Sequence, residues 1–202
     1  MINTSNIAPG YVEAFKNVSN FFKNKVNPNI TQEVVDLIPY ASSILTIGKG
    51  VPGLIILSEV KGSEETWVSA DGVYLVVSNG KIIKTKGLIN NLTRSVLPKI
   101  YYEDLEQNQS YKYFYYLSYD NPFLNDLKVD VKITKLDKEK VKILDSTKQL
   151  QLIEEVLVNE YIGWKIKNKF WIDDEGYIWK SIQNISPKLP SFTIEVTKKP
   201  AL

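Results

Sequence analysis

The fold is decided by the stretch Glu64-Glu-Thr-Trp-Val-Ser-Ala-Asp-Gly-Val-Tyr-Leu-Val-Val-Ser-Asn-Gly-Lys-Ile-Ile-Lys-Thr-Lys-Gly-Leu88. It contains three short runs rich in apolar and β-branched residues. Asp71-Gly72 separates the first run from the second, and Asn79-Gly80 separates the second from the third. An Asn-Gly pair between two such runs is a strong hairpin signal, because both residues accept the positive φ of a type I′ turn. The stretch therefore predicts a three-stranded antiparallel meander.

Strand patterns continue on both sides of this meander. Alternating or apolar runs bounded by turn residues occur at 43–47, 53–60, 111–117, 128–133, 141–144, 164–172, 177–183 and 192–196. Residues 149–161 fit a helix or a strand, and residues 87–110 are interpreted as a long connection or a lid. Roughly ten strands in one sheet curl or split rather than stay flat. We therefore expect a mainly β fold, a curved antiparallel meander forming a half-barrel or an open barrel-like sheet.

The start of the chain has a different periodicity. Tyr11, Phe15, Val18 and Phe22 follow one another at helical spacing and form one apolar stripe. Such a stripe most often packs on the rest of the fold. We expect residues 1–38 to form a helical segment packed on a sheet built from residues 39–202, with 1–202 as a single domain.

The composition excludes several classes of function. The 202 residues contain no Cys and no His, which excludes disulfides, thiol nucleophiles, Cys/His zinc sites and Ser-His-Asp triads. A net charge of +2 argues against a nucleic-acid partner. Arg94 is the only arginine, so bidentate anion clamps are nearly absent. We expect no metal and no cofactor.

The hydropathy pattern bears on location. No run approaches about 18 consecutive apolar residues, so no membrane-spanning helix is expected. The first residues carry neither the basic region nor the apolar region of a secretion signal. Two alternatives remain open from the residues alone: a cytoplasmic protein, or a mature form from which a leader has been removed.

Aromatic side chains are the first candidate binding residues. Their flat apolar faces and polar tips suit stacking on sugars, although packing is their commoner role. The candidates are Trp67, Trp171, Trp179, Tyr113 and Tyr115. Trp171 falls on the lysine-bearing face of its strand by strict alternation, so a bulge or an exposed platform is needed to accommodate it.

Charged side chains give two further candidates. Lys165, Lys167 and Lys169 share one strand face and are candidates for binding an acidic polysaccharide or lipid head groups, although a solvated sheet face is the commoner explanation. Asp173, Asp174 and Glu175 could supply a glycosidase-like acid/base pair, and Asp71 could act as a catalytic base. Because Asp and Gly dominate turns, turn formation explains these carboxylates better.

The motif Trp67-Val-Ser-Ala-Asp-Gly72, followed by Asn79-Gly-Lys-Ile-Ile-Lys-Thr-Lys-Gly-Leu88, resembles the YjbF/GfcB family of group 4 capsule and exopolysaccharide operon lipoproteins. The segment from Asn168 to Gln183, with Pro187 and Pro190, is similar to that family's closing motif. The motif residues that we interpret as structural are Ser69, Asp71, Gly72, Asn79, Gly80, Thr85 and Gly87.

The resemblance implies a non-enzymatic accessory lipoprotein for capsule or exopolysaccharide assembly or export. It implies a location on the periplasmic side of the outer membrane, anchored by an N-terminal lipid, with other secretion proteins and polysaccharide as partners. The first residues lack the family's lipoprotein signal and the sequence contains no Cys, so we expect it to represent a mature form, whose lipid anchor is implied by the resemblance alone. Two alternatives stay open: a periplasmic carrier that holds a lipid or glycolipid in a concave β face, and a carboxylate-based polysaccharide hydrolase.

Overall fold

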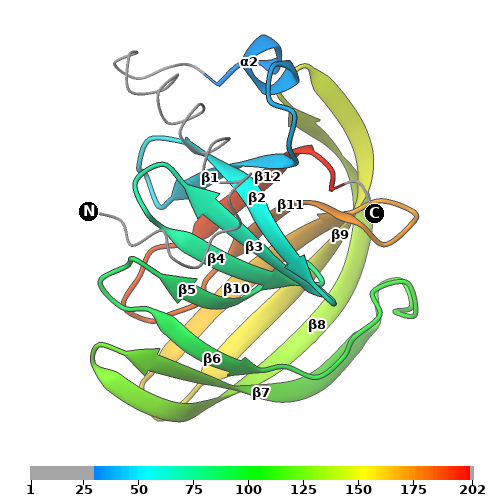
Figure 1. Ribbon diagram of the computed structural model, residues 1–202. Helices are drawn as coiled ribbons and strands as arrows, with labels where there is room; N and C mark the ends of the chain where they lie inside the picture. The colour runs from blue at the N-terminus through cyan, green and yellow to red at the C-terminus, as the bar shows by residue number, and fades with distance from the viewer. Residues whose placement is uncertain (1–29, 201–202) are drawn as a thin grey trace.

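The computed structural model describes residues 30–200, shown in Figure 1. The expected helix with the Tyr11 to Phe22 stripe lies outside the described residues, and so does its packing on the sheet. The described chain opens with a short helix, α2 (Gln32–Asp36), whose N-cap Thr31 accepts a hydrogen bond from the Val34 N–H. No helix in this part of the chain is long and apolar enough to cross a bilayer.

Twelve antiparallel strands form one sheet in the order β5-β4-β3-β2-β1-β12-β11-β10-β9-β8-β7-β6. Their bounds are β1 Ser42–Ile47, β2 Gly53–Lys61, β3 Glu64–Ser69, β4 Tyr74–Ser78, β5 Lys81–Lys86, β6 Leu92–Val96, β7 Ser110–Asp120, β8 Phe123–Ile143, β9 Ser146–Asn159, β10 Trp164–Ile172, β11 Ile178–Gln183 and β12 Phe192–Lys198.

The sheet curls into a nearly closed barrel (Figure 1). The first and last strands pair, with Leu45 opposite Ile194. Among the described strands, the backbone ladder is interrupted between β5 and β6, where side chains bridge the gap. The Leu92 N–H donates to Thr85 Oγ1 at 2.9 Å, and Ser95 Oγ donates to the Ile83 carbonyl at 3.0 Å. We call this gap the seam. The prediction of a curved, barrel-like antiparallel meander is confirmed.

The strand count differs from the prediction at three places. Residues 92–96, expected within a connection, form β6. The ambiguous residues 149–161 fall mostly in β9, where Ile153, Glu155 and Leu157 alternate inward. The runs 128–133 and 141–144, expected as separate strands, both belong to β8, which continues through Asp137 to Glu139 with a register shift between Lys135 and Lys138. A bulge absorbs an extra residue without ending a strand, which is why turn-like residues gave a false signal.

The barrel has two ends, because successive hairpin turns of an antiparallel meander fall on opposite sides. The turns after β1, β3, β5, β7, β9 and β11 form what we call the tip end. The turns after β2, β4, β8 and β10, together with the connection 97–109, form what we call the cavity end. Between the two ends the lumen is filled by a core that includes Leu75, Val129, Leu157 and Phe192, all fully buried.

Candidate functional site

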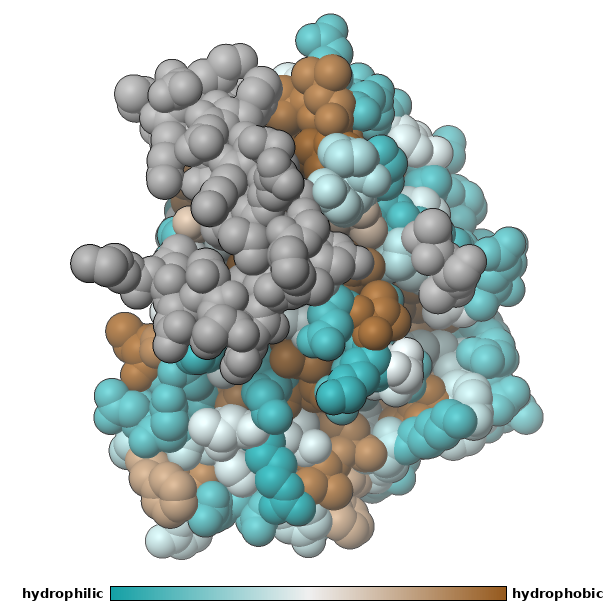
Figure 2. All heavy atoms as spheres, in the orientation of Figure 1, coloured by the Kyte–Doolittle hydropathy of each residue, from teal (hydrophilic) through white to brown (hydrophobic). Residues whose placement is uncertain are grey.

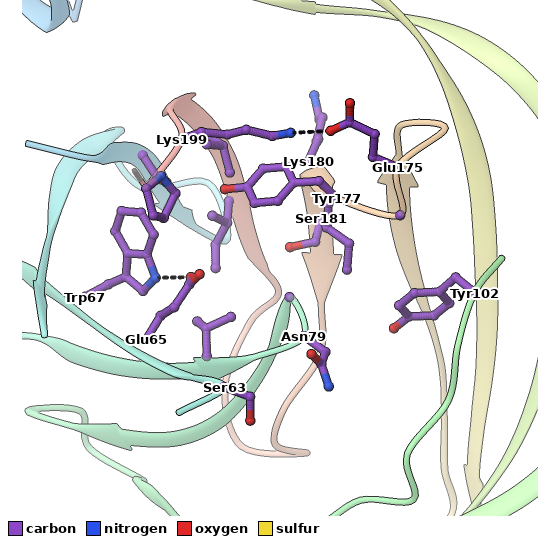
Figure 3. A pocket seen from close by; sticks show the side chains of 18 of the residues that line it. Ser63, Glu65, Trp67, Asn79, Tyr102, Glu175, Tyr177, Lys180, Ser181 and Lys199 are labelled. Atoms are coloured by element: carbon purple, nitrogen blue, oxygen red, sulfur yellow. Dashed lines mark hydrogen bonds and ion pairs between the residues drawn. The ribbon is translucent and has the colours of Figure 1, made fainter. Parts of the chain in front are cut away.

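A cavity of about 460 Å³ opens at the cavity end of the barrel (Figure 3). Its walls come from inner faces of β1, β2, β3, β4, β11 and β12, and from the connection that contains Tyr101 to Glu103. Figure 3 shows Trp67 and Glu65 on one side and Tyr102 on the other, with Tyr177 and Lys199 between them. A volume of this size is ordinary for a small-molecule site.

Glu65 and Trp67 form one wall of the cavity. Residues two apart on β3 point to the same face, so both reach the lumen. Trp67 Nε1 donates to Glu65 Oε2 at 3.0 Å. Burial raises the pKa of Glu65, and the opposing effect of the Trp67 hydrogen bond is smaller. The pair therefore presents an apolar ring edge beside a carboxyl group that resists ionisation.

A second wall of the cavity is built by the turn between β10 and β11. Asp173 accepts hydrogen bonds from the Tyr177 N–H at 2.8 Å and from Trp179 Nε1 at 2.8 Å. Lys199 Nζ lies 3.2 Å from Asp173 Oδ2 and 3.5 Å from Glu175 Oε2, and 4.2 Å from the centroid of the Tyr177 ring. The turn, the last described residues and the Tyr177 ring are thus held together as one wall.

The carboxyl of Asp173 provides a pH-dependent test of this wall. Burial opposes ionisation, but the hydrogen bonds from Trp179, Tyr177 and Lys199 outweigh it and hold the pKa of Asp173 below its ordinary value of 3.8. A carboxyl whose pKa is lowered by folding stabilises the folded state when the pH is above its ordinary, unfolded-state pKa. This stabilisation is lost as the pH falls through the folded-state pKa. We expect Asp173→Asn to be less stable than the parent at neutral pH, with the difference vanishing in acid.

Urea unfolding midpoints measured across a pH series test this expectation. The control is Asp174→Asn in the same turn, since Asp174 is mostly exposed and pairs with Lys138 at the surface. If Asp173→Asn were less stable than the parent by the same amount at neutral and at acidic pH, the lowered pKa of Asp173 would be contradicted.

Below the cavity, a buried polar cluster crosses the lumen. Lys81 Nζ lies 2.5 Å from Glu155 Oε1, and their side chains are 13% and 1% exposed. The Tyr113 hydroxyl donates to Glu155 Oε1 at 2.6 Å and accepts from Lys81 Nζ at 2.9 Å. Burial and the nearby Glu155 charge raise the pKa of Tyr113, which therefore stays a neutral donor. The cluster ties β5 to β7 and β9 across the lumen.

The sequence-predicted binding residues do not form one site. Of these candidates, only Trp67 lines the cavity. Tyr113 and Tyr115 point into the packed lumen, where Tyr115 is buried in the main core. Trp171 is buried against Leu150 and Leu152, with Nε1 donating to Glu139 at 2.8 Å. The bulge needed for Trp171 is present, because the β10–β11 register shifts between Trp171 and Ile172.

The remaining candidates lie on outer surfaces. Trp179 does not line the cavity; Lys148 Nζ covers its ring at 3.8 Å. Lys165, Lys167 and Lys169 lie on the outer face of β10, where Lys167 pairs with Glu154 at 3.0 Å. The acidic turn 173–175 is held by the hydrogen bonds and ion pairs described above and forms a structured turn, as its Asp-Gly pattern indicated.

The family motif residues shape turns and the seam. Asn79 and Gly80 have φ of 48° and 71°, as a type I′ turn requires. Ser69 Oγ accepts from the Val73 N–H at 2.9 Å and donates to Asp71, so the serine caps this turn while Asp71 holds the serine. Thr85 closes the seam, and a Cβ on Gly87 would lie 2.5 Å from the Gly72 carbonyl oxygen.

Sequence reasoning missed the residues that build most of the cavity and the cluster beneath it. Tyr177, Lys199 and Tyr102 carry no local pattern, because turns and a connection bring them together. Glu155 did carry a signal, since it shares the inward face with Ile153 and Leu157. Among residues 30–200, no three His, Cys, Asp or Glu side chains gather closely enough to hold a metal ion.

Comparison with known proteins gives three findings. The family model described as group 4 capsule polysaccharide lipoprotein gfcB, YjbF matches residues 15–197. The uncharacterized lipoprotein GfcB of Escherichia coli (strain K12) is 29% identical over 63 residues, which are 31% of this chain and 29% of that protein. The match therefore spans less than a third of that relative. The crystal structure of the hypothetical lipoprotein YmcC from Escherichia coli (K12) matches this chain with a TM-score of 0.76 at 19% sequence identity. The match covers 94% of this chain and 97% of that one, so the two share the same fold.

Proposed function

The chain belongs to the YjbF family of group 4 capsule polysaccharide lipoproteins, and on that premise we propose that it is a non-enzymatic accessory protein of capsule or exopolysaccharide assembly or export that binds saccharide in its cavity. It acts at the periplasmic side of the outer membrane, beside other secretion proteins. The observation that carries the proposal is the cavity of about 460 Å³, open at one end of an otherwise packed barrel.

The cavity has the mixed chemistry that sugars need. Sugar rings offer apolar C–H faces and many hydroxyl groups, so they are bound by aromatic surfaces flanked by hydrogen-bonding groups. The rings come from Trp67, Tyr101, Tyr102 and Tyr177, while Glu65 and Glu103 add polar groups. Glu103 and Tyr101 are exposed at the entrance, where they remain accessible to an entering chain end.

Binding without bond cleavage is supported by the interactions that the candidate catalytic carboxylates already make within the fold. Of the carboxylates singled out by sequence, Asp173 accepts four hydrogen bonds within its turn and Asp71 holds Ser69. Asp174 pairs with Lys138 at the surface, and Glu175, which lines the cavity, pairs with Lys199. The carrier alternative is less well supported, because polar groups such as Glu65, Glu103 and Lys199 line the cavity beside its apolar residues.

Titration calorimetry with oligosaccharides from partially hydrolysed capsule tests the proposal. Tyr177→Leu removes a ring from the cavity wall, and Tyr116→Leu is its control on the outer face of β7, where the ring is similarly half-buried. We expect Tyr177→Leu to weaken binding about tenfold, since an aromatic anchor contributes more than about 1 kcal/mol, and Tyr116→Leu to leave it unchanged.

Two results would count against the proposal. Absence of binding by the parent chain at millimolar oligosaccharide would remove the saccharide site. Shortened oligosaccharides recovered after incubation would show catalysis and replace the accessory role by a hydrolase. Deletion of the gene, with capsule measured at the cell surface, tests the cellular role separately; unchanged surface capsule would argue against it.

A further inference from the structure

The tip end of the barrel exposes large apolar side chains on separate turns. Val51 follows β1, Ile89 follows β5, Phe123 follows β7 and Tyr161 follows β9, with exposed fractions of 72%, 78%, 76% and 95%. Among the large apolar side chains of residues 30–200, only Leu37, at 76%, is comparably exposed, and it follows α2. Figure 2 shows apolar atoms at the left edge of the molecule, over the turns that follow β5 and β7 in Figure 1.

These side chains stand on four different turns of the tip end. Leu124 and Ile162, at 36% and 42% exposed, lie beside Phe123 and Tyr161 and extend each tip. A protein partner would need a matching pocket for every separate tip, whereas a fluid bilayer accommodates protruding aliphatic and aromatic groups at its interface without such a match. Tyr and other amphipathic aromatics are typical of that interface.

The charges around the tips favour an anionic surface. Lys49, Lys86 and Lys188 lie in or beside turns of this end, are exposed, and have no ion-pair partner within the described residues. Basic groups beside apolar anchors are attracted to anionic head groups.

Most of the acidic side chains in or beside the same turns accept hydrogen bonds or form an ion pair. Asp71 accepts from a neighbouring serine, Asp120 accepts from Asn91 at 2.7 Å, and Asp126 pairs with the chain's arginine at 3.0 Å. Hydrogen bonds from Asn91 hold the pKa of Asp120 below its ordinary value, so this acid is ionised but already bonded. Glu160 is exposed and makes no ion pair within residues 30–200. Asp71 and Asp120 accept from neutral groups and keep their charge. Outside ion pairs, Lys49, Lys86, Lys165 and Lys188 therefore stand against Asp71, Asp120 and Glu160, which leaves the tip end with a small excess of positive charge.

We infer that the tip end is a membrane-docking surface, which inserts Val51, Ile89, Phe123 and Tyr161 into the interface of an anionic lipid bilayer. The barrel then stands on the membrane with its cavity end directed away from the lipid. This inference does not depend on saccharide binding in the cavity.

The test uses the chain without any attached lipid, so that binding reports on protein side chains. Flotation with phosphatidylethanolamine–phosphatidylglycerol vesicles gives a partition coefficient. We expect the triple variant Ile89→Ser, Phe123→Ser, Tyr161→Ser to lower it about a hundredfold or more, because each inserted side chain contributes roughly a factor of ten. The matched control Leu37→Ser, Val96→Ser, Phe114→Ser removes three exposed apolar groups elsewhere and is expected to keep binding within about twofold of the parent.

A second variant keeps the aromatic anchor and reports its depth. Tyr161→Trp is expected to bind as the parent does and to lose fluorescence in vesicles that contain brominated acyl chains, in excess of the quenching of the parent's own tryptophans. The inference is overturned if the parent does not float with these vesicles, if the tip and control triples lose binding equally, or if the fluorescence of the introduced indole is not quenched. Concentration-dependent self-association abolished by the tip triple, without vesicle binding, would instead assign the tips to contact between two copies of the chain.

Discussion

Replacing Lys81 by Met is expected to destabilise the barrel by about 3–5 kcal/mol, which for a domain of this size lowers the melting temperature by roughly 10 °C. The substitution leaves Glu155, whose side chain is 1% exposed, without its cation inside the lumen. A stranded buried charge loses both its solvation and its partner. The Tyr113 hydroxyl, 2.6 Å from Glu155 Oε1, still donates but supplies no charge.

The place of the pair in the sheet adds to this expectation. Lys81 begins β5, the strand on one side of the seam, while Glu155 lies on β9 across the lumen. Because the seam lacks a backbone ladder, contacts across the lumen contribute more to holding β5 in place than they would in a fully paired strand.

Matched variants separate charge from packing. The same change at an exposed pair, Lys138→Met, removes the partner of Asp174, whose side chain is 83% exposed, and should cost at most about 1 kcal/mol. The double variant Lys81→Met, Glu155→Gln leaves no stranded charge and should recover most of the lost stability. Urea unfolding followed by tryptophan fluorescence measures all three. A Lys81→Met deficit no larger than that of Lys138→Met would show that the buried pair contributes little.

The local parts of this fold were predictable because turns carry their own chemistry. Asn79 and Gly80 have positive φ at the positions where only such residues are comfortable, and the alternation from Trp164 to Ile172 matches β10. The family motif likewise marks turn and seam residues, which is why it identifies a fold before it identifies a site.

The closure of the barrel and the cavity were not predictable in the same way. Leu45 faces Ile194 across a pairing that no local signal specifies, and the seam depends on side chains such as those of Thr85 and Ser95. The cavity combines aromatic rings from β3, from the 97–109 connection and from the β10–β11 turn, three unrelated parts of the chain. Aromatic residues were a sound class to nominate, but whether a ring packs, as Trp171 does, or lines a cavity is decided by tertiary contacts.

Replacing Gly87 by Ala is expected to destabilise the chain by about 3 kcal/mol through two separate effects. Gly87 has a φ of 90°, a conformation that costs a residue with a side chain roughly 1–3 kcal/mol. Its added Cβ would also lie 2.5 Å from the Gly72 carbonyl oxygen and 3.3 Å from the Val73 Cα. Those atoms belong to the backbone of the β3–β4 turn and cannot rotate away, so overpacking adds roughly 1–3 kcal/mol.

Gly72→Ala isolates the steric part, because Gly72 has a φ of 89° but an added Cβ there would meet nothing within 4 Å. It therefore suffers the conformational cost alone, and the difference between the two variants measures the close approach of β5 to the β3–β4 turn. We expect Gly87→Ala to unfold at a clearly lower urea concentration than Gly72→Ala, with the same dependence of stability on urea, since both variants expose the same surface on unfolding. Equal midpoints would mean that the turn after β5 can move away from the β3–β4 turn at little energetic cost. Gly87 would then be required only by the backbone conformation of its own turn, and would not hold the end of β5 in place beside the seam.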